Sequence, residues 1–172
     1  SLVFLTKLYN INYDLSLIKD IILILIIILI FNLLNKSFLG DSGAYSISTV
    51  VGFILIDFFK TNENFSVLFI VVMLWYPAFE TLFSIIRKLI SKFNPAYPDN
   101  NHFHQLLFCY VNSRISKRFY ANISAAILIN VFNLLVFLIA ILNYQSSILL
   151  SFILISNITI YIYLFKKLNN ER

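Results

Sequence analysis

Five long apolar runs separated by short polar breaks limit what this chain can fold into. A helix rises 1.5 Å per residue, so about 20 apolar residues cross the hydrocarbon of a bilayer, and backbone groups in lipid must bond within the helix. Hydrophobic residues make up 60% of the chain and charged residues 12%, which excludes an ordinary water-soluble domain. We therefore expect an all-α, polytopic membrane protein with about five spans. The expected spans are Leu17–Leu34, Ala44–Phe59, Phe65–Ile86, Ala121–Leu142 and Ser147–Phe165.

The second apolar run, Ala44–Phe59, is short for a membrane span. Gly43 before it and Lys60 after it can lie at the interface, so we count it as a span. Residues 1–10 fit either the tail of an earlier helix or an interfacial segment. Cys109 is the only cysteine, which excludes an internal disulfide and a thiolate metal site, and we give it no role.

The positive charges predict an orientation, because Lys and Arg are retained on the cytoplasmic side during insertion. If the break at about 35–43 is cytoplasmic, alternation places the long break at about 87–120 and the C-terminal tail on the same side. Lys7, Lys19 and Lys60 then lie on or near the outer side. The predicted cytoplasmic cations are Lys36, Arg87, Lys88, Lys92, Arg114, Lys117, Arg118, Lys166, Lys167 and Arg172.

The first polar island runs from Ser37 to Gly43 and contains Asp41 between two glycines. A carboxylate at the mouth of a membrane helix is costly, and glycine permits close approach of a ligand. Mg²⁺ prefers oxygen ligands and usually keeps substrate phosphates among them, so Asp41 suits a magnesium site. An equally good interpretation is that Asp41 caps the following helix, and the two roles are compatible.

The second polar island, Asn94–Gln105, holds both histidines of the chain and two prolines that predict a loop. In extended backbone, His102 and His104 point to one side and Phe103 to the other. No third ligand except Asp99 is close enough to suggest zinc. The pair is better suited to bind a phosphate-bearing substrate with the nearby cations. The alternative is that the histidines are merely solvated and the cations merely set orientation.

Three motifs taken together resemble a known family. They are F-L-G-D-S-G at Phe38–Gly43, P-x-x-E-T at Pro77–Thr81 and N-P-x-x-P-D-x-x-H-x-H-Q at Asn94–Gln105. This set resembles the polyprenyl-phosphate N-acetylhexosamine-1-phosphate transferases of glycosyltransferase family 4. The resemblance covers about residues 32–108, and the later apolar runs fit in number and hydropathy only.

The resemblance implies roles for individual residues. Asp41 matches the aspartate that coordinates the catalytic Mg²⁺, with Mn²⁺ as a substitute, and His102 and His104 match two histidines of an H-x-H-H loop that engages the nucleotide-sugar. Gln105 replaces the third histidine and cannot titrate. Glu80 stands where the family commonly has Asp. Its position three residues after Pro77, inside an apolar run, suggests a helix break re-satisfied by polar side chains, and we interpret it as purely structural. Asp41, His102 and His104 are thus the expected catalytic residues. The expected substrate-binding residues are Asn35, Gly40, Ser42, Arg87, Asp99 and Gln105.

The implied reaction transfers N-acetylhexosamine-1-phosphate, most simply N-acetylglucosamine-1-phosphate, from a UDP-sugar to undecaprenyl phosphate, with release of UMP, to start cell-envelope polysaccharide synthesis. The implied location is the bacterial inner membrane, with the site facing the cytoplasm. Membrane lipid and a homodimer are expected partners, and nucleic acid is not. The family's upstream Asp-Asp pair is absent, so we expect residues 1–172 to be the C-terminal portion of one membrane-embedded transferase domain, inactive alone.

Other functions remain open at this stage. A phospho-N-acetylmuramoyl-pentapeptide transferase-like enzyme is one, although H-F-H-Q lacks the run of consecutive histidines associated with those enzymes. A transporter subunit is another, because Asp41, Asp57 and Glu80 could line an ion path. A non-catalytic membrane scaffold is the third.

Overall fold

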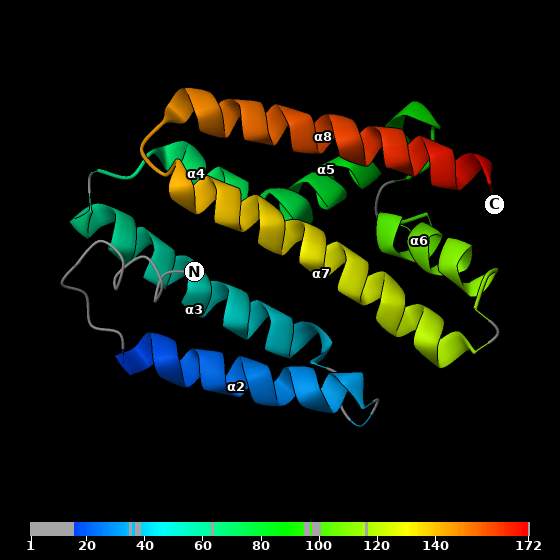
Figure 1. Ribbon diagram of the computed structural model, residues 1–172, viewed down its shortest axis with the longest axis horizontal. Coiled ribbons are helices and arrows are strands. Elements are labelled where there is room, and N and C mark those ends of the chain that lie inside the picture. Colours follow the sequence, from blue (N-terminus) through cyan, green and yellow to red (C-terminus); the bar gives the residue numbers. More distant parts are fainter. Residues whose placement is uncertain are drawn as a thin grey trace. The chain divides into compact units, whose positions relative to one another are not determined.

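The computed structural model describes residues 16–34, 36, 39–62, 64–94, 97, 101–115 and 117–171. Every regular element in these ranges is a helix (Figure 1). The chain divides into two compact units, residues 1–65 and 66–172, and each is described by itself. The helices are α2 (Ser16–Leu33), α3 (Gly40–Thr61), α4 (Val67–Met73), α5 (Trp75–Ile90), α6 (Phe103–Asn112), α7 (Arg118–Leu142) and α8 (Ser147–Asn170).

The all-helical, polytopic prediction is confirmed, although fewer spans than expected meet the criteria of length and apolarity. Among the described residues, α3, α7 and α8 are long and apolar enough to cross a membrane. The bent pair α4 and α5 makes a fourth crossing if it is one span. The run predicted as the first span, Leu17–Leu34, is helical in α2.

In the first unit, α3 begins earlier than predicted. We expected the span to start at Ala44 after a loop, but the helix starts at Gly40, whose φ of 66° lies in the left-handed region that glycine tolerates. Leu39 occupies the N-cap position, so the interpretation of Asp41 as the cap is wrong. Asp41 lies instead in the first turn, where its negative charge interacts favourably with the positive end of the helix dipole. At the other end of α3, the rings of Phe58, Phe59 and Phe65 pack edge to face.

In the second unit, the run predicted as one span, Phe65–Ile86, is broken, as the position of Glu80 after Pro77 suggested. Helices α4 and α5 meet at Leu74 with a bend of 71°. Pro77 explains the break, because proline lacks an N–H and its ring would clash with the carbonyl of Met73 in a continuous helix. In the first turn of α5 the missing N–H costs nothing. The buried side chains of Val72 and Trp75 anchor the two sides of the bend.

Helices α7 and α8 form an antiparallel pair joined by a short turn at 143–146. The start of α4 is tied to this turn, since the Ser66 N–H donates to the Tyr144 carbonyl (3.0 Å) and the Ser66 and Ser147 hydroxyls are 2.8 Å apart. Tyr161 of α8 packs against aromatic rings of α5, α6 and α8 itself. Its ring centroid is 5.0 to 6.4 Å from those of Tyr76, Phe79, Phe83, Phe103 and Phe165.

The predicted loop at about 87–120 is largely helical. It contains the last turn of α5, all of α6 and the start of α7. Helix α5 ends at Ile90. Two residues later Lys92 adopts a left-handed conformation with φ 58°, and the Phe93 N–H donates to the Lys88 carbonyl. The loop therefore begins with a left-handed turn ahead of the two prolines, and Pro95 and Pro98 themselves lie outside the described residues.

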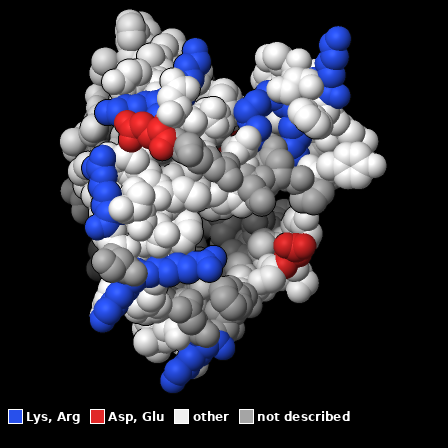
Figure 2. All heavy atoms as spheres, turned by 90° about the vertical axis from the view of Figure 1, so that its right-hand side faces the viewer, with Lys and Arg blue, Asp and Glu red and all other residues white. Residues whose placement is uncertain are grey.

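The described cations of the second unit gather at one end. The ends of α5 and α8, the start of α7 and both ends of α6 meet there, with the Arg87 guanidinium 5.8 Å from the Phe165 ring and that of Arg118 5.8 Å from the Phe108 ring. Figure 2 looks toward the side where α8 ends, and Lys and Arg are widespread on it. The cations of this end are Arg87, Lys88, Lys92, Arg114, Lys117, Arg118, Lys166 and Lys167.

Candidate functional site

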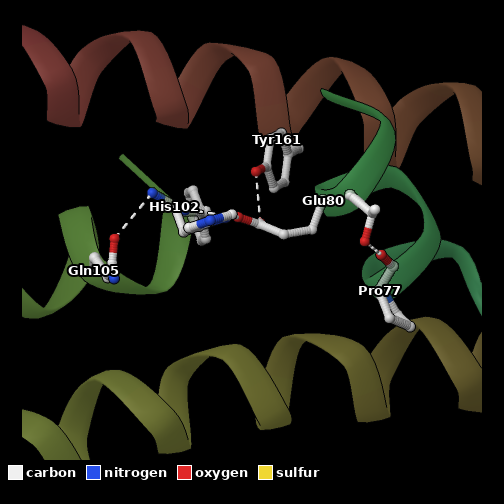
Figure 3. Close-up of polar contacts among 7 residues, drawn as sticks. Pro77, Glu80, His102, Gln105 and Tyr161 are labelled. Atoms are coloured by element: carbon white, nitrogen blue, oxygen red, sulfur yellow. Dashed lines mark hydrogen bonds and ion pairs between the residues drawn. The ribbon is translucent and has the colours of Figure 1, made fainter. Parts of the chain in front are cut away.

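The candidate site in the second unit is built around the carboxylate of Glu80, in the second turn of α5. One oxygen, Oε1, accepts a hydrogen bond from the Phe103 N–H (2.9 Å) and lies 3.2 Å from His102 Nδ1. The other, Oε2, accepts from the Tyr161 hydroxyl (2.6 Å). Figure 3 shows the Glu80 carboxylate between His102 and Tyr161. The Glu80 carboxylate thus links α5 to α6 and α8. Its side chain is only 13% exposed, so these contacts are largely shielded from water.

His102 stands at the N-cap position of α6, in extended backbone with φ −84° and ψ 149°. The first N–H groups of a helix lack partners within it. The Glu80 carboxylate satisfies that of Phe103, and Gln105 Oε1 accepts from the His102 N–H (3.2 Å). The sequence analysis assigned Gln105 to substrate binding. The structure adds a role that we did not predict, which is to fix the backbone of His102 from within α6.

The contact with Glu80 determines how the His102 imidazole can act. If the Glu80 carboxylate is ionised it only accepts hydrogen bonds, and the ring nitrogen facing it, Nδ1, then carries the proton. In that arrangement Nε2 accepts when the ring is neutral and donates when it is protonated. The side chain is 30% exposed, so a ligand can reach it.

His104 lies against His102, with ring centroids 5.7 Å apart and planes 16° from parallel. The two rings share a side, as predicted, while Phe103 is buried against Tyr161. The reason differs from the predicted one, because only His102 is extended and His104 lies in the first turn of α6. Desolvation lowers the pKa of His104 below its usual value, and His102 adds to this, although Glu80 opposes it.

A pocket of about 350 Å³ lies at the charged end of this unit. Arg87, predicted to bind substrate, lines it from the last turn of α5 together with Lys88. Asn101, directly before His102, lines it as well. The Lys88 ammonium donates to the Tyr97 carbonyl (2.6 Å), which ties the loop to α5. Cationic and amide side chains of this kind suit a phosphate-bearing ligand. The full lining is Arg87, Lys88, Ser91, Phe93, Asn94, Tyr97 and Asn101.

The other predicted residues belong to the first unit or lie outside the described residues. Asp41 and Ser42 are exposed in the first turn of α3, and the Ser42 carbonyl accepts from the Ser46 hydroxyl (2.8 Å). Gly40 supplies the left-handed start of that helix. Asn35 and Asp99 fall outside the residues that the structure describes.

The predicted magnesium site can be tested against the donors present. Within the described parts of the chain, no three His, Cys, Asp or Glu side chains cluster closely enough to hold a metal ion. Asp41 is an exposed oxygen donor of the type that Mg²⁺ prefers, so it fits as one ligand of a site to which other groups contribute.

Sequence analysis missed two parts of this arrangement. Glu80 was interpreted as purely structural, although an acidic residue inside an apolar run is a general sign of function. Tyr161 carried no signal, because it is one of ten tyrosines in an aromatic-rich chain. Their contacts join residues 22 to 81 positions apart, and only the fold brings them together.

Comparison with characterised proteins finds two similar transferases. The chain is 34% identical over 79 residues to a probable undecaprenyl-phosphate N-acetylglucosaminyl 1-phosphate transferase of Bacillus subtilis (strain 168), a match covering 44% of this chain and 21% of that protein. It is 34% identical over 71 residues to the undecaprenyl-phosphate alpha-N-acetylglucosaminyl 1-phosphate transferase of Thermotoga maritima, covering 41% of this chain and 23% of that protein.

The matches thus span between a fifth and a quarter of the length of each relative. No protein-family model matches the chain, and no solved structure does. The similarity agrees with the resemblance inferred from the motifs.

Proposed function

We propose that this chain forms part of a membrane enzyme that transfers N-acetylglucosamine-1-phosphate from UDP-N-acetylglucosamine to undecaprenyl phosphate and releases UMP. The similarity to two transferases named for this reaction carries the proposal. The geometry of the second unit supports it, because Arg87 and Lys88 line a pocket that Asn101 also lines, and His102, which contacts Glu80, directly follows Asn101 in the chain.

The proposed reaction joins two anions, so charge dictates what the residues must do. An oxygen of the lipid monophosphate forms a bond to the β-phosphorus of the nucleotide-sugar, and the bond from that phosphorus to the oxygen bridging the α-phosphate breaks. The electron pair leaves with UMP. Phosphoryl transfer of this type depends mainly on positioning and electrostatic stabilisation. Arg87 and Lys88 offset the phosphate charges, and His102 Nε2 bonds a phosphate oxygen.

Asp41 is proposed to hold Mg²⁺, or Mn²⁺ in its place, through its exposed carboxylate. The metal, when bound, supplies positive charge that stabilises the phosphates and the departing nucleotide. Asp41 itself lies in the first turn of α3, at the end of an apolar helix that is long enough to span the bilayer. A carboxylate at such a helix end can meet a water-soluble phosphate while the helix remains in lipid.

The site is proposed to face the cytoplasm of a bacterial cell, with the enzyme in the inner membrane. The clustering of Lys and Arg at one end of the second unit supports this orientation. It also suits the substrates, since the polyprenyl tail needs lipid and the nucleotide needs water. The lipid-linked product would start a cell-envelope polysaccharide.

The test of the metal role is Asp41→Asn in the full gene product, assayed in membranes with undecaprenyl phosphate, labelled UDP-N-acetylglucosamine and Mg²⁺. Loss of one charge-stabilising interaction is expected to reduce turnover about 100-fold or more. Asp57→Asn, in the same helix but near its other end, is the matched control and should retain activity. Unchanged turnover in Asp41→Asn would contradict the role, and label crossing the membrane without lipid product would indicate a transporter.

A further inference from the structure

Glu80 makes contacts that packing alone does not require. We infer that Glu80 is a positioning residue, which holds His102 with Nδ1 protonated so that Nε2 is presented to a substrate phosphate. This inference rests on the proposed function and extends it to a residue that the sequence analysis considered purely structural. It depends on the three hydrogen-bonding contacts of the Glu80 carboxylate.

The burial of Glu80 has an energetic cost. Its side chain is only 13% exposed, and removing an ionised carboxylate from water is costly unless its oxygens are hydrogen-bonded. A buried charge can often be replaced by an apolar side chain of similar volume with no loss of stability. Stability therefore does not account for an acidic side chain at this position, and a role at the adjacent histidine does.

A group needed only to cap α6 would accept a hydrogen bond from the Phe103 N–H and would need no contact with the His102 ring. Oε1 of Glu80 also meets His102 Nδ1, so the same atom fixes both the start of the helix and the imidazole. The Tyr161 hydroxyl holds the second oxygen at 2.6 Å, which prevents the carboxylate from turning away.

The orientation of His102 is fixed from several sides. Its backbone N–H is bonded to Gln105, and one face of its ring stacks on His104. With Nδ1 also facing Glu80, the ring is held in one principal orientation. An orienting carboxylate behind a histidine is a general means of selecting the tautomer.

The kinetic test is a double-mutant cycle in the full gene product, with Glu80→Gln and His102→Ala alone and combined. Glutamine keeps the size of the side chain and can still accept from Phe103 and bond Tyr161, but it lacks the charge. Glu80→Gln is expected to lower kcat about 10- to 100-fold, the range typical of groups that orient a functional histidine. In the His102→Ala background it should lower kcat less than about twofold, because a positioning residue has nothing left to position.

Two further variants complete the kinetic test. Glu80→Asp keeps the charge and should restore a large part of the activity lost in Glu80→Gln. Glu171→Gln, a neutralisation just after the end of α8, is the matched control and should leave kcat unchanged. Equal losses from Glu80→Gln with and without His102 would overturn the inference.

A second measurement does not depend on activity. Nitrogen-15 spectra of histidine-labelled protein, recorded where the ring is neutral, should show His102 protonated on Nδ1 in the wild type and shifted toward protonation on Nε2 in Glu80→Leu, which places no acceptor opposite Nδ1. A wild-type ring protonated on Nε2 would overturn the inference. If the wild type forms no lipid-linked product, the proposed function fails, and these spectra alone decide whether Glu80 orients His102.

Discussion

His102 and His104 lie against each other, yet their surroundings differ. His102 Nδ1 faces the Glu80 carboxylate directly, and His104 stacks on the His102 imidazole. Burial lowers the pKa of His104, so this ring favours its neutral form in the folded protein. At neutral pH, His104 is therefore expected to act through hydrogen bonding and stacking instead of positive charge.

The lowered pKa of His104 predicts a pH-dependent stability. In the unfolded chain His104 titrates at its ordinary pKa, so as pH falls the unfolded state takes up the proton first and gains stability relative to the folded state. The melting temperature should fall between about pH 8 and about pH 5, and should fall less in His104→Asn. Thermal unfolding in detergent at several pH values measures both. An identical fall in the two proteins would show that His104 does not contribute.

Residue types and spacing were enough to predict part of the site. They placed His102 and His104 together with Phe103 on the other side, and the structure confirms this. They could not identify the partner of His102, because Glu80 is 22 positions away and nothing local marks the pair. Sequence spacing shows which side chains share a face of one element, and contacts between elements depend on how those elements pack.

At the scale of the elements, Tyr161 is where α5, α6 and α8 meet. Its ring packs among aromatic side chains of all three helices, and its hydroxyl bonds the Glu80 carboxylate. Removing only the hydroxyl leaves the packing in place and deprives a nearly buried carboxylate of a donor. The two contributions can therefore be separated by substitution.

Tyr161→Phe is expected to lower the free energy of unfolding by about 1 to 3 kcal/mol, the cost of leaving a charged acceptor without its donor. Tyr161→Ala also removes the ring and should cost about 3 to 5 kcal/mol. Tyr163→Phe, a change on the same helix at a side chain that is 64% exposed, is the control and should stay within about 0.5 kcal/mol of wild type. Equilibrium unfolding in mixed micelles measures all three free energies. Equal effects of Tyr161→Phe and Tyr163→Phe would show that the hydrogen bond from Tyr161 to Glu80 does not stabilise the fold.

The helices themselves were predicted unevenly. The ranges Ala121–Leu142 and Ser147–Phe165 agree well with α7 and α8, because each is a long apolar run between clear polar breaks. A helix break was suggested by Pro77 and Glu80, and the structure confirms it. Its position at Leu74 and its angle were not predicted, since apolarity continues through the bend. Helix α6 was missed because its short amphipathic stretch lies in a break that composition alone marked as a loop.

On the scale of the whole molecule, the described cations of the second unit lie at one end of the apolar helices, as the positive-inside pattern predicted for the segments that carry them. Apolar side chains along the spanning helices remain widely exposed, for example Phe152 of α8. Such surfaces suit contact with lipid or with further helices. The arrangement fits an enzyme whose acceptor is a lipid and whose donor is soluble.

The most direct test of this account follows two atoms of the donor at once. UDP-N-acetylglucosamine labelled with ³²P in the β-phosphate and ³H in the sugar is added, with undecaprenyl phosphate and Mg²⁺, to membranes containing the full gene product. Transfer of the sugar with its phosphate predicts both labels in the lipid in equal amounts, together with unlabelled UMP. Lipid carrying ³H without ³²P, or no labelled lipid at all, would contradict the proposed reaction.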